Sequence, residues 1–156
     1  MTQAQQQTQQ QTVSPEEAQA RNEKWAQEQL VKIQKQCFAN GIEFNKFKAD
    51  KCLSLPPAIG IWAFTDNKKN EYWAITGQLP VDIAPASVAA NQREVARYFS
   101  MSWQLKAARM EESLAEGKML MGDAETQKAA IDELIQKANA LYDIYEKDDL
   151  WRSAKL

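Results

Sequence analysis

The alternation of apolar residues predicts one antiparallel β-hairpin near the middle of the chain. Two apolar runs, residues 58–65 and 71–76, flank a polar cluster at 66–70 of the kind that forms turns. The simplest register pairs Thr65 with Glu71. Because side chains alternate between the two faces of a strand, this one pair fixes the rest. It predicts that Ala63 lies opposite Trp73 and that Ile61 lies opposite Ile75.

Both faces of the predicted hairpin are apolar. Trp62, Phe64 and Tyr72 share one face, whereas Ile61 and Trp73 share the other. A hairpin with one solvated face would carry polar residues there, and a lone hairpin is marginal in water, so we expect both faces to be covered. For the face of Trp62, three covers stay open. They are the connection at 42–56, the C-terminal segment with Trp151, and a second subunit.

Three longer segments show helical periodicity. Ser14, followed by a proline and two glutamates, predicts the start of the first helix, which Asn40-Gly41 should end. The second helix is expected from a cap at Ser87 to about Ala115. The third is expected from a cap at Asp123 to about Lys147.

The remaining segments carry weaker signals. Residues 42–56 show no clean period, and we interpret them as a packed connection with at most one short strand at 42–45. Residues 77–85 are expected to be turn and loop because glycine and two prolines punctuate them. Residues 1–13 are rich in glutamine and predict a disordered tail. The fold class is therefore α+β and mainly helical, with one globular domain at 14–156 whose three main helices pack on a small antiparallel hairpin.

Composition excludes several kinds of site. With 156 residues and a net charge of −2, the chain lacks the basic surface of a general nucleic-acid or anionic-membrane binder. It has no histidine, and its two cysteines, Cys37 and Cys52, fit no zinc or redox spacing, so we expect no metal and no cofactor. The N-terminus does not resemble a signal peptide and no apolar run approaches about 20 residues, so a soluble cytoplasmic protein is expected.

Four groups or single residues are candidates for a binding or catalytic site. Lys106 projects near the middle of the apolar arc of the second helix, where it acts either as a base or nucleophile of lowered pKa or as a side chain that reaches out to water. The turn after the hairpin holds Gly77, Pro80 and Asp82, and loops of this kind often bind ligands. Arg97 lies on the opposite side of the second helix from the apolar arc. The aromatic hairpin face, with Trp62, Phe64 and Tyr72, could grip a peptide or pack in the core.

Several strings of residues resemble a small proteobacterial family of unknown function. They are Ile61-Trp62, Tyr72–Asp82, Ala96–Ser100, Trp103–Lys106 and a closing group of Tyr142, Asp148, Asp149, Leu150 and Trp151. The similarity spans most of residues 20–151 and is most specific from Tyr72 to Lys106. Members of that family often carry a histidine after the aspartate of the turn, where this chain has Ile83. The resemblance implies a bacterial source and brings no activity.

Two functions from different classes stay open. The first is a non-catalytic binding or adaptor domain that takes a protein partner or forms a homodimer. The second is an enzyme of unrecognised type that uses Lys106, Arg97 or Asp82. A closed pocket lined by these polar groups would favour the enzyme, and an exposed aromatic hairpin face would favour the adaptor.

Overall fold

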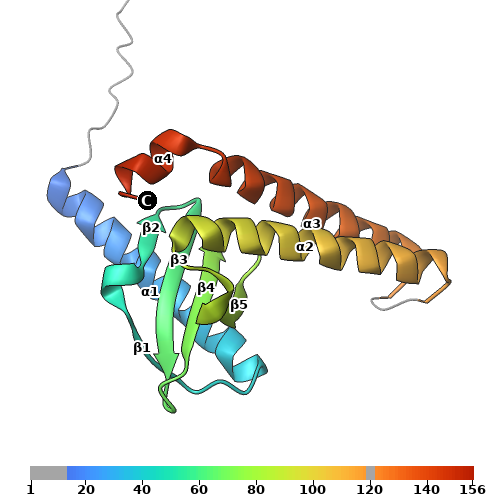
Figure 1. Cartoon of the computed structure of the whole chain (residues 1–156), viewed down its shortest axis with the longest axis horizontal. Coiled ribbons are helices and arrows are strands. Elements are labelled where there is room, and N and C mark those ends of the chain that lie inside the picture. Colours follow the sequence, from blue (N-terminus) through green and yellow to red (C-terminus); the bar gives the residue numbers. More distant parts are fainter. Residues whose placement is uncertain (1–13, 119–121) are drawn as a thin grey trace, which may run out of the picture.

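The computed structural model describes residues 14–118 and 122–156 and shows an α+β fold in three layers. Helix α1 (Pro15–Ala39) covers one face of an antiparallel sheet. Helices α2 (Gln92–Ala115), α3 (Ala124–Tyr145) and α4 (Asp148–Ser153) cover the other face (Figure 1). The predicted tail at 1–13 lies outside the described residues. None of the helices described is long and apolar enough to cross a membrane.

The sheet is larger than the predicted hairpin. Its central strands are β3 (Ile59–Asp66) and β4 (Glu71–Gly77), and their register is the predicted one, with Thr65 opposite Glu71. Three further strands flank them, and only the first overlaps the short strand that the sequence allowed at 42–45. They are β1 (Phe44–Phe47) and β2 (Leu53–Leu55), which both pair with β3, and β5 (Asp82–Pro85), which pairs with β4.

The expected connection at 42–56 and the expected loop at 77–85 are therefore corrected to strand-bearing segments. Each of these three strands is three or four residues long. Such a run is too short to show alternation, and its conformation depends on the backbone of the neighbouring strand. The predicted arrangement of three helices on a hairpin is therefore corrected to a five-stranded sheet with helices on both faces.

The helix starts follow from their capping side chains. Ser14 accepts a hydrogen bond from the Glu17 amide at 3.2 Å, and Asp123 accepts one from the Thr126 amide at 2.7 Å, so both predicted caps are confirmed. Helix α2 starts later than predicted, because Asn91 rather than Ser87 is its cap.

The end of α3 is explained by the acidic residues that follow it. Helix α3 ends at Tyr145, two residues earlier than expected, and Asp148 and Asp149 begin α4 instead. Negative charge is unfavourable at the C-terminus of a helix and favourable at the N-terminus. The break between the helices thus moves both carboxylates from the unfavourable end of one helix to the favourable end of the next.

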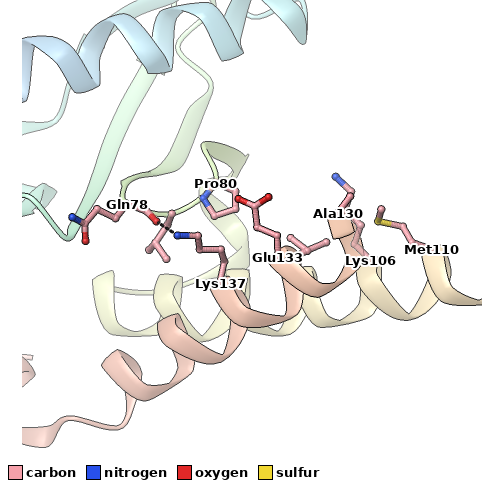
Figure 2. A pocket seen from close by; sticks show the side chains of 9 residues that line it. Gln78, Pro80, Lys106, Met110, Ala130, Glu133 and Lys137 are labelled. Atoms are coloured by element: carbon pink, nitrogen blue, oxygen red, sulfur yellow. Dashed lines mark hydrogen bonds between the residues drawn. The ribbon is translucent and has the colours of Figure 1, made fainter. Parts of the chain in front are cut away.

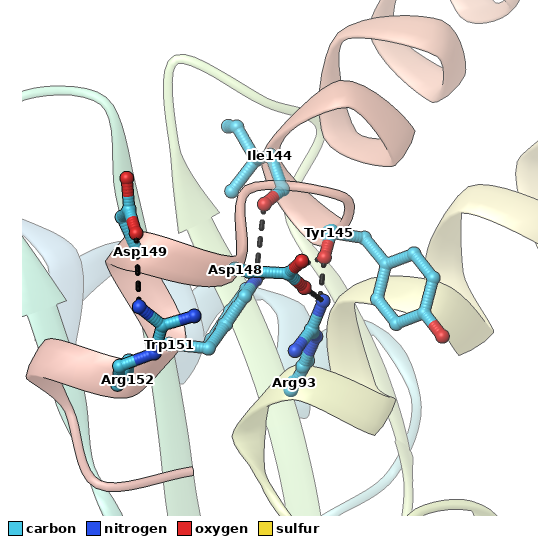
Figure 3. Close-up of polar contacts among 7 residues, drawn as sticks. All are labelled: Arg93, Ile144, Tyr145, Asp148, Asp149, Trp151 and Arg152. Carbon is cyan, nitrogen blue, oxygen red and sulfur yellow. Dashed lines mark hydrogen bonds and ion pairs between the residues drawn. The ribbon is translucent and has the colours of Figure 1, made fainter.

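The first core lies between the sheet and α2, α3 and α4. Trp73, Phe99, Trp103 and Trp151 are among its buried side chains. Trp151 is fully buried, which confirms that it docks on the core, and its indole nitrogen donates to the carbonyls of Ile144 and Tyr145 at 3.0 Å each (Figure 3). The docking of α4 therefore completes this face of the sheet.

Helix α1 forms the second core with the opposite face of the sheet. Ile33 and Cys37 of α1 pack against Trp62 and Phe64, and the Trp25 and Trp62 rings lie 6.0 Å apart. Of the three expected covers, the 42–56 segment contributes, whereas Trp151 packs on the other face. The main cover is α1, which was not among those expected. Amphipathicity shows that a helix buries one side but not which face of a sheet receives it.

One directional contact fixes α1 on the sheet. The side chain of Gln29 is almost fully buried, and its Oε1 accepts a hydrogen bond from the backbone amide of Gly77 at 3.1 Å. Strand β5 pairs with β4 only as far as Ile75 and Asp82, so the Gly77 amide lies beyond the last rung of that ladder. Gln29 therefore satisfies a backbone donor that no neighbouring strand reaches.

Candidate functional site

The candidate site is a groove of about 570 Å³ between the α2/α3 pair and the turn that follows β4. We call it the arm groove. Its lining residues, drawn in Figure 2, are Gln78, Leu79, Pro80, Lys106, Met110, Ala130, Glu133, Leu134 and Lys137. A volume of this size is typical of ligand pockets, which combine an apolar lining with a few polar groups.

The groove exists because α2 and α3 extend past the end of the sheet (Figure 1). Near the sheet both helices pack on the first core, for example through Trp103 and Ala138. Farther along they pack on each other through Ala107, Met110 and Ile131. We call these extended segments, residues 107–115 and 124–135, the arm. Within the described residues, no further helix or strand covers the arm. The side of the arm that faces the turn after β4 is therefore uncovered.

Three charged side chains line the apolar floor of the groove. Lys137 Nζ donates to the Gln78 carbonyl at 2.9 Å, a contact that holds the turn against α3 (Figure 2). Glu133 precedes Lys137 by four residues, a spacing at which such residues commonly form an ion pair on a helix. Among the described residues, however, no ion pair involves Glu133 or Lys106. The groove thus offers one positive and one negative side chain, Lys106 and Glu133, that form neither an ion pair nor a hydrogen bond among the described residues, whereas Lys137 is held by a carbonyl.

The structure brings together two of the candidate residues that the sequence indicated. Pro80 and Lys106 line the arm groove, and Gly77 directly precedes its first residue. Lys106 is exposed, so it does not lie in the middle of a buried arc as expected. The arc is displaced because Ala107 and Met110 face the helix partner, whereas Leu105 is 54% exposed.

Asp82 and Arg97 do not join Lys106. Both carboxylate oxygens of Asp82 accept hydrogen bonds, one from the Trp103 indole nitrogen at 2.9 Å and one from the Ile83 amide at 2.8 Å. Asp82 therefore orients a core tryptophan. Arg97 is nine residues from Lys106 on the same helix, which places the two about 180° apart. It lies 3.9 Å from Glu94 in an exposed pair.

The aromatic hairpin face is interior. Trp62 and Phe64 are 6% and 0% exposed, and Tyr72 stacks on Phe64 with ring centroids 5.2 Å apart. Of the two interpretations left open for this face, gripping a peptide or packing in the core, the structure shows packing in the core. The face is a wall of the second core, and α1 and β1 occupy the space that a peptide would need.

Asp66 is a structural carboxylate that sequence reasoning missed. It accepts hydrogen bonds from the Lys68 and Asn70 amides, the Asn70 side chain and the Tyr72 hydroxyl. Burial raises the pKa of Asp66, but these hydrogen bonds outweigh burial and leave the pKa below its ordinary value. Burial, together with the hydrogen bond to Asp66, raises the pKa of the Tyr72 hydroxyl. The signal was the position of Asp66 as the first residue of the polar turn, where aspartate commonly bonds the following backbone.

Arg93 holds the end of α3 and the start of α4 against α2. Its guanidinium donates to the Tyr145 carbonyl at 3.2 Å and to Asp148 at 2.6 Å, and it lies 5.2 Å from the centre of the Tyr145 ring (Figure 3). The hydrogen bond from Arg93 lowers the pKa of Asp148. This cluster supports the docking of Trp151, and we assign it a structural role.

A second hollow, of about 450 Å³, lies on another side of the arm. Its lining residues are Glu111, Leu114, Ala115, Lys128, Ile131 and Asp132. Within the residues described, no group of histidine, cysteine or acidic side chains could hold a metal ion.

Comparison with known proteins identifies a family. A family model described as "Domain of unknown function (DUF4826)" matches residues 18–151, a range that includes both cores and the arm groove. The match confirms the predicted resemblance to a family of unknown function. No curated protein and no solved structure matches the chain.

Proposed function

This chain belongs to the DUF4826 family, a family of unknown function, and from that premise we propose that it is a non-catalytic binding domain. Its recognition surface is the arm groove. The observation that carries the proposal is the combination of an apolar floor with Lys106 and Glu133, two opposite charges not used in ion pairs within the chain. Apolar surface supplies most of the affinity at such sites, and a few polar groups fix the orientation of what binds.

The enzyme alternative has less support from the geometry. A catalytic constellation requires its groups within hydrogen-bond reach of one another or of one reacting atom. Asp82 is engaged by Trp103, and Arg97 lies on the far side of α2 from Lys106. The three residues of that alternative therefore do not converge on one cavity.

The test is site-specific photo-crosslinking in cells of the source organism. Ala130 lines the groove and Ala129 is its exposed neighbour on α3, so the two alanines form a matched pair that differs by about 100° around the helix. A photo-reactive phenylalanine analogue placed at Ala130 should give a discrete adduct on gels, and the same analogue at Ala129 should not. Equal labelling from both positions, or no adduct from Ala130, would refute the proposed function.

A further inference from the structure

We infer that the occupant of the arm groove is a second copy of this chain, so that two arms pack together as a four-helix bundle. The inference rests on the proposed function, because it takes the arm groove as the binding surface. It adds the identity of the partner, the symmetry of the contact and the side chains that align it.

The arm is incomplete as a helical layer. Its buried apolar residues are Ala107, Met110 and Ile131, a small cluster for two helices of this length. Stable helical architectures bury the apolar stripe of each helix against a further element, and the bundle of two helix pairs is a common solution. A second arm placed over the groove would cover Leu134 and the neighbouring Leu79, which are only half-buried in one copy.

The charges of the groove indicate which kind of partner fits. An acidic partner would meet the carboxylate of Glu133, and a basic partner would meet Lys106 and Lys137. A two-fold axis through the groove brings residue i of one copy against residue j of the other, and the reverse. In that arrangement Lys106 of each copy faces Glu133 of its partner. The groove is therefore complementary to its own image, and the ion pair forms twice.

Lys137 explains why Glu133 is available for this contact. Its ammonium group donates to the Gln78 carbonyl, which takes it away from the carboxylate four residues earlier. The turn at Gln78–Pro80 thereby shapes the groove and leaves Glu133 for the second copy.

The experiment is sedimentation velocity on the full chain over a concentration series, with charge swaps. The wild-type chain should show a monomer–dimer equilibrium. Lys106→Glu and Glu133→Lys should each raise the dimer dissociation constant by at least about tenfold, because each sets like charges against one another twice. The double variant, Lys106→Glu with Glu133→Lys, should return the constant to near the wild-type value, because it restores both pairs with the signs exchanged.

Matched control swaps lie in the second hollow of the arm. Lys128→Glu and Asp132→Lys reverse one positive and one negative charge on α3, outside the arm groove, and should leave the dissociation constant unchanged. Circular dichroism of every variant checks that the helices are intact. The inference is overturned if the control swaps raise the dissociation constant as much as the groove swaps do. It is also overturned if the double variant does not restore the affinity that each single variant loses.

The two proposals fail in different ways. A wild-type chain that stays monomeric at all concentrations overturns the second copy as partner. If Ala130 then gives an adduct whose mass is not twice 17.7 kDa, the binding function stands with a different partner. If Ala130 gives no adduct, the binding function fails as well.

Discussion

The sheet body and the arm use the same two helices in different ways. In the body, α2 and α3 cover a sheet whose other face is covered by α1, and Trp62, Trp73, Trp103 and Trp151 are all buried there. In the arm, the same helices pack mainly on each other, although Leu134 also contacts the first core. The body therefore holds most of the buried apolar surface and most of the stability, whereas the arm offers a surface that the fold does not need to bury.

The largest expected effect is in the body. Trp73 is 4% exposed and its indole nitrogen donates to the carbonyls of Ala86 and Ala89, so Trp73→Ala should lower the free energy of unfolding by about 3–5 kcal/mol. Met110→Ala in the arm should cost about 2 kcal/mol, the lower end for such truncations. Urea denaturation followed by circular dichroism measures both. Equal losses would mean that the arm is as important to stability as the body.

Glycine substitutions sharpen the same comparison at the backbone. Gly77 has a φ of +109°, and a Cβ added there would lie 2.4 Å from the Ala58 carbonyl oxygen. Gly77→Ala should therefore cost at least about 2 kcal/mol. Gly117, at the end of α2, also has a positive φ but nothing within 4 Å of an added Cβ. Gly117→Ala should cost about 1 kcal/mol, the ordinary penalty of that conformation. Thermal unfolding of both variants gives the order, and a reversed order would contradict the close approach at Gly77.

Acid should affect the body through Asp66. The folded pKa of Asp66 lies below its ordinary value of 3.8, so the folded state favours the carboxylate. Its contribution to stability is present above the unfolded pKa and is lost as pH falls below 3.8 through the folded pKa. Asp66→Asn should be less stable at neutral pH and should lose less stability on acidification than wild type. Urea midpoints from pH 7 down to acid measure this, and identical pH profiles would exclude the effect.

The smallest expected effect on folding is at Lys106. The residue is exposed at the groove, so Lys106→Met should change the free energy of unfolding by no more than about 0.5 kcal/mol, with a slight gain if anything. Urea unfolding, at a protein concentration low enough to keep the chain monomeric, measures this change in the free energy of unfolding. A clear loss of stability would show that Lys106 stabilises the monomer through an ion pair.

The parts of the fold that could be predicted are those set by local sequence. The register of β3 and β4 follows from two alternating runs and a polar turn, and three helix ends follow from Ser14, Asp123 and Gly41. Strand β5 is too short to show alternation although it pairs with the strand before it, and the placement of α1 depends on residues far along the chain, which no local pattern encodes.

The same limit applies to the groove. The sequence indicated Pro80 and Lys106 separately, from a turn and from an odd residue on an apolar helix. It could not indicate that Glu133 and Lys137 join them, because residues from three separate segments meet there. The spacing of Glu133 and Lys137 on the polar side of α3 was the available signal.

The hydrogen bond between Gln29 and Gly77 makes one backbone amide an internal reporter. Amide hydrogen exchange measures how often a donor loses its acceptor, and the acceptor of the Gly77 amide belongs to α1 rather than to the sheet. The Gly77 amide should therefore exchange with solvent whenever α1 lifts from the sheet, even while the β3/β4 ladder stays closed. Its exchange rate, set against that of the amides paired within the ladder, gives the free energy that holds the N-terminal helix in place.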